Sequence, residues 1–433
     1  MSMAKTIIHF DLNRTVLMSD AAGGRGMEDT LNYLLSEVVW GKVSEVGWRP
    51  EPNITPTSVR PNTTPPLLIN YKKFVDHQFP YIQDGTDAVP EGYESASTFN
   101  KVAKKQRKDL HGTFTNADQP GSSLHSSLHK LLEHMSFDQA SQKQALRTAA
   151  IIEPGLLADT WRQGRHFLLP SFLYFLVHLQ SNEELMDSVR IVYRTFGNDL
   201  LEVKKELDVM SSGNHPLMPG FFLDKRLTIH APHSTFYRRG PLSNDCFLTY
   251  GTLERPKDIH ESDQNVHHFY SNMKGTKVIQ GFSNVLREMH VMIEADPRQC
   301  IGIRDHWDYW SANGESDNSG KPLLIDDNVV SRARERHVFV DDHVEDDHAH
   351  IVDVRNVSDG SCVAFEAAIG INMLRAHPYD AILDRDYFIN LLRDVIMVKE
   401  DDGSMQRSGC GQSTEQSGEG KEVSGHQKKR AKH

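Results

Sequence analysis

Four short segments, far apart in the chain, carry the residue types that phosphoryl transfer requires. Asp11 and Asn13 come first, Thr195 and Lys321 follow, and the acidic pair Asp341–Asp342 comes last. A carboxylate can attack phosphorus and form an aspartyl phosphate. A hydroxyl group and a lysine can hold the phosphoryl oxygens, and a hard divalent cation bound by carboxylates can neutralise the remaining charge. These residues therefore predict a phosphoryl-transfer site, provided that the fold brings them together.

The elements that must position these residues are predicted strands. Short apolar runs at residues 6–10, 188–194 and 337–341 each lead to one of the polar residues, whereas Lys321 stands at the start of the run at 321–326. Runs that are apolar throughout and alternate with helical patterns are typical of a buried parallel sheet. The carboxyl ends of parallel strands meet at one edge, where open α/β sheets bind ligands. The expected fold is therefore α/β, with a Rossmann-like parallel sheet flanked by helices.

The order of the motifs, Asp-x-Asn-x-Thr, strand-Thr, Lys and strand-Asp-Asp, resembles that of the haloacid dehalogenase-like (HAD-like) hydrolase superfamily. The resemblance implies a magnesium-dependent phosphatase that acts on a phosphorylated small molecule through an aspartyl phosphate. It implies three catalytic residues, with the first as nucleophile: Asp11, Asn13 and Lys321. It implies that the phosphoryl group is bound by Thr195, Phe196 and Lys321. It also implies that Mg²⁺ is held by Asp11, Asn13, Asp341 and Asp342.

Asn13 is a departure from the superfamily pattern. Phosphatases of the superfamily usually carry Asp two residues after the nucleophile, where it protonates the leaving group and then activates water. An amide cannot act as a general acid or base near neutral pH, although its backbone carbonyl can still bind magnesium. Because general acid–base catalysis is worth about 10²–10⁴ in rate, Asn13 predicts slow hydrolysis, a long-lived phosphoenzyme, a substrate with a good leaving group, or no turnover. The alternative function is therefore a catalytically weak or inactive HAD-like protein that binds a phosphorylated ligand or a protein partner.

The resemblance and the local patterns divide the chain into several parts. A HAD-like core is expected at residues 1–27 and 182–399, and a large, mainly helical cap domain is expected as an insertion at 28–181. Residues 226–256 carry two β-rich runs and predict either a β insertion in the core or a second small cap. Residues 400–433 are rich in Ser, Gly, Gln and charge, with almost no apolar residue. Such a segment cannot bury enough surface to fold, so it predicts a disordered tail.

The composition argues against several classes of protein. The chain has 433 residues, of which 38% are hydrophobic and 25% charged, as in a soluble globular protein. A net charge of −11 argues against a nucleic-acid partner. The most apolar stretch, 167–179, is too short to cross a bilayer, so no membrane partner is expected. Four widely spaced cysteines without a CxxC pair fit a reducing compartment. We expect a cytoplasmic location, with Lys428-Lys429-Arg430 as a candidate nuclear import signal.

Two alternatives for the metal site stay open. The pair Asp326–Asp327 also follows an apolar run and could replace Asp341–Asp342. The 20 residues between Lys321 and the later pair favour that later pair, because they leave room for an intervening segment. The run at 341–350, DDHVEDDHAH, could also form a zinc, manganese or iron site of its own, since it combines imidazoles with carboxylates. The same run equally fits an exposed acidic loop.

Overall fold

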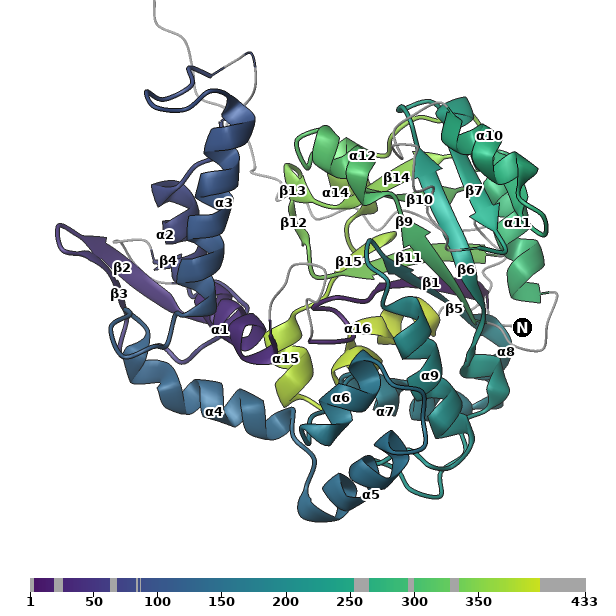
Figure 1. Ribbon diagram of the computed structural model, residues 1–433, viewed down its shortest axis with the longest axis horizontal. Helices are drawn as coiled ribbons and strands as arrows, with labels where there is room; N and C mark the ends of the chain where they lie inside the picture. Colours follow the sequence, from purple (N-terminus) through teal and green to yellow (C-terminus); the bar gives the residue numbers. More distant parts are fainter. Residues whose placement is uncertain are drawn as a thin grey trace, which may run out of the picture. The chain divides into compact units, whose positions relative to one another are not determined.

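An eight-stranded sheet lies at the centre of the fold (Figure 1). Its strand order is β15-β11-β1-β5-β9-β6-β7-β8, in which the first six strands pair in parallel and β7 and β8 extend the edge by antiparallel pairing. In that order the strands span Met373–Arg375, Glu335–Asp341, Lys5–Asp11, Val189–Thr195, Cys300–Asp305, Ile229–Arg238, Cys246–Tyr250 and Lys277–Gln280. The predicted α/β class, with a large and mainly parallel sheet flanked by helices, is confirmed.

The computed structural model describes residues 4–18, 26–62, 68–82, 85, 87–252, 265–294, 300–327 and 335–397, with only the backbone for residues 230–233. The predicted disordered tail at 400–433, with its basic run Lys428-Lys429-Arg430, lies outside the described residues.

Strand β1 is mainly apolar because both faces of the sheet are covered. On one face, Phe10 packs against helices α7 (Pro170–Gln180) and α16 (Tyr387–Ile396), with ring centroids 5.1 Å from Phe172 and 5.8 Å from Phe388. On the other face, Ile7 joins a second apolar cluster that contains residues of α11 (Phe282–Glu294). A strand that is buried on both faces loses the alternation of apolar and polar residues, which explains the nearly continuous apolar run.

The region at 28–181 is mainly helical and includes a small sheet with the order β3-β2-β4. Its helices are α1 (Met27–Val38), α2 (Tyr71–Gln78), α3 (Ala96–Gly112), α4 (His125–His134), α5 (Gln139–Ala149), α6 (Leu156–Arg162) and α7. Its strands are β2 (Trp40–Ser44), β3 (Gly47–Pro50) and β4 (Ile69–Asn70). Helix α7 packs on α16, and α6 packs on α9 (Leu200–Ser211), so the end of this region covers one face of the central sheet (Figure 1).

The other elements are short helices, 3₁₀ turns and two small sheets. The helices are α8 (Glu183–Ser188), α10 (Asn265–Asn272), α12 (Trp307–Ala312), α14 (Phe365–Ala368) and α15 (Pro378–Leu383). Short 3₁₀ turns lie at Ser122–Leu124, Lys225–Leu227, Ser243–Asp245 and Asp317–Ser319. Two small sheets pair β10 (Lys321–Ile325) with β14 (Val352–Asn356), in parallel, and β12 (Val344–Asp346) with β13 (Ala349–His350). The β-rich run predicted at 226–256 contributes β6 and β7 to the edge of the central sheet.

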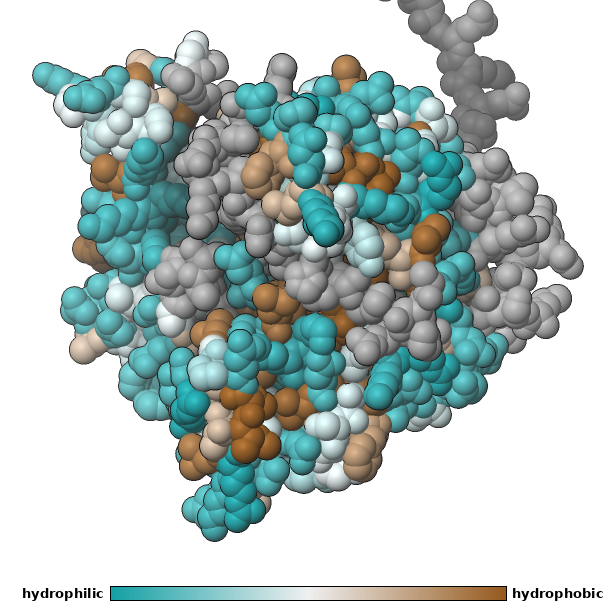
Figure 2. Space-filling view, turned by 45° about the vertical axis from the view of Figure 1, so that its right-hand side comes forward, coloured by the Kyte–Doolittle hydropathy of each residue, from teal (hydrophilic) through white to brown (hydrophobic). Residues whose placement is uncertain are grey.

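The surface is largely polar on the face shown in Figure 2, where small apolar patches lie between hydrophilic side chains. Among the described helices, none combines the length and the apolar character that a membrane crossing requires.

Candidate functional site

The site begins where the strand order reverses. In the sheet, β5 and β9 lie on one side of β1, and β11, which follows them in the chain, lies on the other side. Phe10 of β1 pairs with Val340 of β11, so the next residues, Asp11 and Asp341, end neighbouring strands. Open α/β sheets bind ligands at the carboxyl ends of the strands that flank such a reversal.

Lys321 bridges these two carboxylates. It begins β10, and its Nζ forms an ion pair with Asp11 Oδ1 and lies 2.9 Å from Asp341 Oδ2. All three side chains are almost completely buried, with 3%, 7% and 1% of their side-chain surface exposed, respectively. Phe196 flanks the amine, since Lys321 Nζ lies 5.3 Å from the centre of its ring. The ammonium group is thus held by opposite charges in a place that water hardly reaches.

The electrostatics of this bridge favour a charged lysine. Burial alone would lower the pKa of Lys321, but the carboxylates of Asp11 and Asp341 outweigh it and raise the pKa. Burial raises the pKa of Asp11 well above its usual range, Lys321 opposes this shift, and the two acidic residues at the end of β11 add to it. A further cation would therefore favour the ionised form of Asp11, which is the form that can act as a nucleophile.

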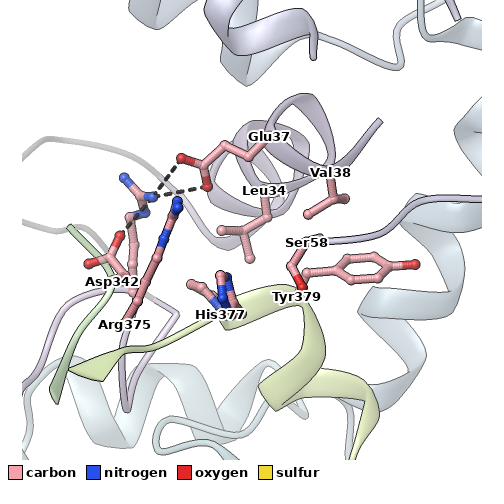
Figure 3. A pocket seen from close by; sticks show the side chains of 10 residues that line it. Leu34, Glu37, Val38, Ser58, Asp342, Arg375, His377 and Tyr379 are labelled. Carbon is pink, nitrogen blue, oxygen red and sulfur yellow. Dashed lines mark hydrogen bonds and ion pairs between the residues drawn. The ribbon is translucent and has the colours of Figure 1, made fainter. Parts of the chain in front are cut away.

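Asp342 is held by a second cation. Its carboxylate lies 2.8 Å from Arg14, whose guanidinium also donates hydrogen bonds of 3.1 and 3.2 Å to Glu37 of α1 (Figure 3). Arg14 has a φ of 63°, a left-handed conformation, and it lies within the turn after β1. Thr15 completes the turn, because its hydroxyl donates to Asp11 at 3.3 Å and accepts the backbone N–H of Asp342 at 3.1 Å. The sequence motifs gave no indication of Arg14 or Glu37.

Thr195 and Asn13 form the neighbouring part of the site. The Thr195 hydroxyl is buried at the end of β5 and accepts a 2.8 Å hydrogen bond from the backbone N–H of Gly197. The amide of Asn13 donates to Thr195 Oγ1 at 3.3 Å and to Asp199 Oδ2 at 3.0 Å. A Cβ on Gly197 would lie closer to Asp199 Oδ2 than van der Waals contact allows, so glycine at this position leaves room for the Asp199 carboxylate beside Thr195.

Asp199 is a site residue that sequence analysis missed. It is almost fully buried, lies directly before α9, and its Oδ2 also lies 3.5 Å from Thr195 Oγ1. The available signal was its position four residues beyond Thr195 and two beyond Gly197. An acidic residue at this position is common at helix starts, where it usually stabilises the N-terminus of the helix and has no catalytic role.

Three carboxylates could hold a cation here. Ligand atoms of Asp11, Asp341 and Asp342 all lie within 4.8 Å of one another. Opposite ligands of an octahedral Mg²⁺ are roughly 4.2 Å apart, so this spread suits a hard divalent ion. Asn13 Oδ1 is buried and has no hydrogen-bond partner among the described residues. When all three carboxylates are ionised, two cations of the described residues contact them, Lys321 and Arg14, and Mg²⁺ would offset the remaining negative charge.

The alternative metal positions are less favourable. Asp326–Asp327 follow the far end of β10, whose five residues span about 16 Å, away from Lys321. In the run at 341–350, β12 and β13 form a hairpin, and the His348 side chain is 88% exposed. His350 stacks on Phe365 with ring centroids 5.2 Å apart. Among the described residues, the possible metal groups include Asp341 and Asp342 from this run but none of its histidines.

A cavity lies on the far side of Glu37, the partner of Arg14, between α1 and the start of α2. It has a volume of about 200 Å³ and is lined by Glu37, Trp40, Ser58, Arg60, Asn70, Lys72, Lys73, Glu345 and Arg375. A smaller pocket beside Asp342 shares Glu37, Ser58 and Arg375 with it (Figure 3). Of the three carboxylates, Asp342 lines the smaller pocket, and none of them lines the larger cavity.

Comparison of the chain with protein-family models, curated proteins and solved structures found no match.

Proposed function

We propose that this protein is a magnesium-dependent HAD-like hydrolase that removes a phosphoryl group from a small phosphate ester, with Asp11 as the nucleophile. The observation that carries the proposal is the position of Lys321, whose ammonium contacts both Asp11 and Asp341 at the carboxyl edge of the sheet. These residues come from three distant parts of the chain. The proposal includes the assignment of 1–27 and 182–399 as core and 28–181 as cap.

In the proposed reaction, an oxygen of Asp11 attacks phosphorus and the bond from phosphorus to the ester oxygen breaks. Lys321 and the hydroxyl of Thr195 hold the phosphoryl oxygens and offset their charge. The carboxylates of Asp11, Asp341 and Asp342 would hold Mg²⁺, together with an oxygen of Asn13, and the ion would supply further charge neutralisation. Water then attacks the aspartyl phosphate and releases inorganic phosphate.

The proton transfers need a group other than Asn13. In the proposal, Asp199 supplies it, because its carboxylate is hydrogen-bonded to the Asn13 amide. Asp199 protonates the departing ester oxygen and later takes a proton from the attacking water. Asn13 then acts as a positioning residue that holds the Asp199 carboxylate beside Thr195.

A second candidate is a catalytically weak or inactive HAD-like protein that binds a phosphorylated ligand or a protein partner. The amide at Asn13 favours it, because the residue two positions after the nucleophile cannot itself transfer a proton. In this case Lys321, Thr195 and the cation would bind phosphate without turnover.

A cytoplasmic location belongs to the same proposal, as does the absence of a nucleic-acid partner. Cys246, Cys300 and Cys362 are free thiols in the described part of the chain, which suits a reducing compartment.

The test is the release of phosphate from a generic aryl phosphate by the full chain with and without Mg²⁺. We expect magnesium-dependent turnover, and we expect Asp11→Asn to lower it more than about 10³-fold, as loss of a nucleophile does. If Asp11→Asn keeps the wild-type rate, the nucleophile assignment is wrong. If the wild type is inert but binds inorganic phosphate in the presence of Mg²⁺, the second candidate replaces the first.

A further inference from the structure

A second polar cluster lies at the opposite end of β11 from the carboxylates. Glu335 and His337 stand at the start of this strand, and His290 reaches them from α11. Four residues of strand, about 13 Å, separate His337 from Asp341. The cluster is therefore distinct from the candidate phosphoryl-transfer site.

Three ligand atoms converge in this cluster. His290 Nε2 lies 2.7 Å from Glu335 Oε1, His337 Nε2 lies 3.0 Å from the same oxygen, and the two imidazole nitrogens are 3.5 Å apart. Ligands of a tetrahedral zinc ion at 2.0–2.1 Å are about 3.3 Å from one another. An ion could thus bind all three atoms with only small movements of the side chains.

The surroundings suit a site that an ion can enter from solvent. The side chain of His337 is 6% exposed and fixed in the sheet, whereas those of His290 and Glu335 are 33% and 24% exposed. Behind His337 lies His9 of β1, whose Nε2 is 3.3 Å from His337 Nδ1. Imidazoles that bind metals almost always have such a hydrogen-bond partner on the second ring nitrogen, because it orients the ring.

We propose that His290, His337 and Glu335 form a binding site for a borderline transition-metal ion of the zinc class. Two imidazoles and one carboxylate are typical ligands of Zn²⁺ and unlike the oxygen ligands that Mg²⁺ prefers. Three protein ligands leave a fourth position for water. The site does not depend on the proposed hydrolase function, and its failure would leave that proposal unchanged.

The directions of the hydrogen bonds indicate how the positions of the histidine protons must change when a metal ion binds. Arg194 can only donate, and it lies 3.1 Å from His9 Nδ1, so without an ion the His9 proton is on Nε2 and points to His337 Nδ1. His337 then carries its proton on Nε2, where it donates to Glu335. Metal binding requires that nitrogen to be free. The protons of His9 and His337 therefore move to Nδ1. His290 Nε2, which also donates to Glu335 without an ion, must lose its proton in the same way, and that proton moves to His290 Nδ1. No proton is released overall, and Arg194 loses its contact with His9.

Arg194 has other partners that make this change feasible. Its Nε donates to Asp305 at 3.0 Å, and its Nη2 donates to the carbonyl of Pro322 at 3.1 Å. Both bonds are independent of His9. The side chain thus stays fixed when the single bond to His9 is exchanged for metal–nitrogen bonds.

The test is equilibrium dialysis of the full chain, without an affinity tag, against Zn²⁺ in an excess of Mg²⁺. The excess Mg²⁺ occupies the carboxylate cluster, so that bound Zn²⁺ reports the imidazole site. We expect one tightly bound Zn²⁺ per chain. His290→Gln and Glu335→Gln should each weaken the affinity at least tenfold, since even the loss of an outer partner costs about 10–100-fold. Both side chains are partly exposed, so the variants should fold, and circular dichroism would verify this.

A matched control is offered by His129, whose Nε2 lies 3.1 Å from that of His125 on the exposed face of α4. Two imidazoles one helical turn apart can bind zinc weakly. His129→Gln should leave the tightly bound ion unchanged. The proposal is overturned if the wild type binds no Zn²⁺, if His290→Gln and Glu335→Gln bind it like the wild type, or if His129→Gln removes it.

Discussion

The side-chain amide of Asn13 donates a 3.0 Å hydrogen bond to the carboxylate of Asp199. The first residue stands in the turn after β1, and the second stands directly before α9. The contact places the Asp199 carboxylate next to Thr195. The amide of Asn13 itself cannot act as a general acid or base. The Asp199 carboxylate can transfer protons, and it is hydrogen-bonded to residue 13, the position at which phosphatases of the superfamily usually carry an acid.

Replacement of that carboxylate tests its role. Asp199→Asn keeps the shape of the side chain and removes its ability to transfer a proton. We expect kcat for an alkyl phosphate to fall by about 10²–10⁴, the usual worth of general acid–base help, with little change in KM. Steady-state kinetics over a range of pH would measure both values. Asp208→Asn, on the exposed side of the same helix, is the control and should keep the wild-type rate. Equal rates for the two variants would place the acid–base group elsewhere.

Introducing an acid at position 13 tests whether the wild-type site already has a general acid. In Asn13→Asp, a carboxyl group would stand about 3 Å from that of Asp199, and two carboxylates so close cannot both ionise, so the pKa of one rises. The protonated group can act as a general acid. Because Asp199 already fills this role in the proposal, we expect no gain in kcat for an alkyl phosphate, which has a poor leaving group, when steady-state kinetics of the variant and the wild type are compared. An increase of about 10²-fold or more would show that the wild type lacks a general acid and would favour the second candidate.

The sequence was sufficient to predict the three strands that end at or near Asp11, Thr195 and Asp341. The runs that lead to Asp11, Thr195 and Asp341 form parallel strands, because segments that are apolar on both sides can only lie in the middle of a covered sheet. The predicted residues meet because the strand order puts β1 between β5 and β11. Lys321 joins them from β10, which lies outside the central sheet.

The missed features depend on contacts that sequence patterns do not encode. Arg14 contacts Asp342 and Glu37 across long separations in sequence, and no periodicity indicates which charges will pair. The region predicted to be mainly helical also contains the hairpin of β2 and β3, which ends in Pro50 at the start of a proline-rich stretch. The contact between His9 and His337 can be predicted only when β1 and β11 are known to be neighbouring strands.

Removal of the Lys321 charge should destabilise the protein unless a cation replaces it. Lys321→Met keeps the apolar part of the side chain but leaves the carboxylates of Asp11 and Asp341 buried without their partner. Breaking a buried ion pair typically costs about 3–5 kcal/mol. We expect urea denaturation to show a loss of this size, partly recovered by millimolar Mg²⁺. Lys277→Met is the control, because the ion pair of Lys277 with Glu288 is on the surface, and it should cost less than about 1 kcal/mol. A variant as stable as the wild type without Mg²⁺ would show that the bridge contributes little.

The affinity for Mg²⁺ should depend on pH through Asp342. Burial raises the pKa of this carboxyl to about 7; Arg14 opposes the shift, and Asp341 adds to it. Because the raised pKa favours the protonated form, the group is mostly neutral below pH 7 and ionised above it, and only the ionised form binds the cation. Mg²⁺ should therefore bind about tenfold more weakly at about pH 6 than at about pH 8, since one pKa unit corresponds to a factor of ten. Titration calorimetry of the full chain at the two pH values would measure this, with Asp342→Asn expected to bind more weakly and with a shallower pH dependence. The same affinity at both values for the wild type would exclude Asp342 as a ligand that titrates in this range.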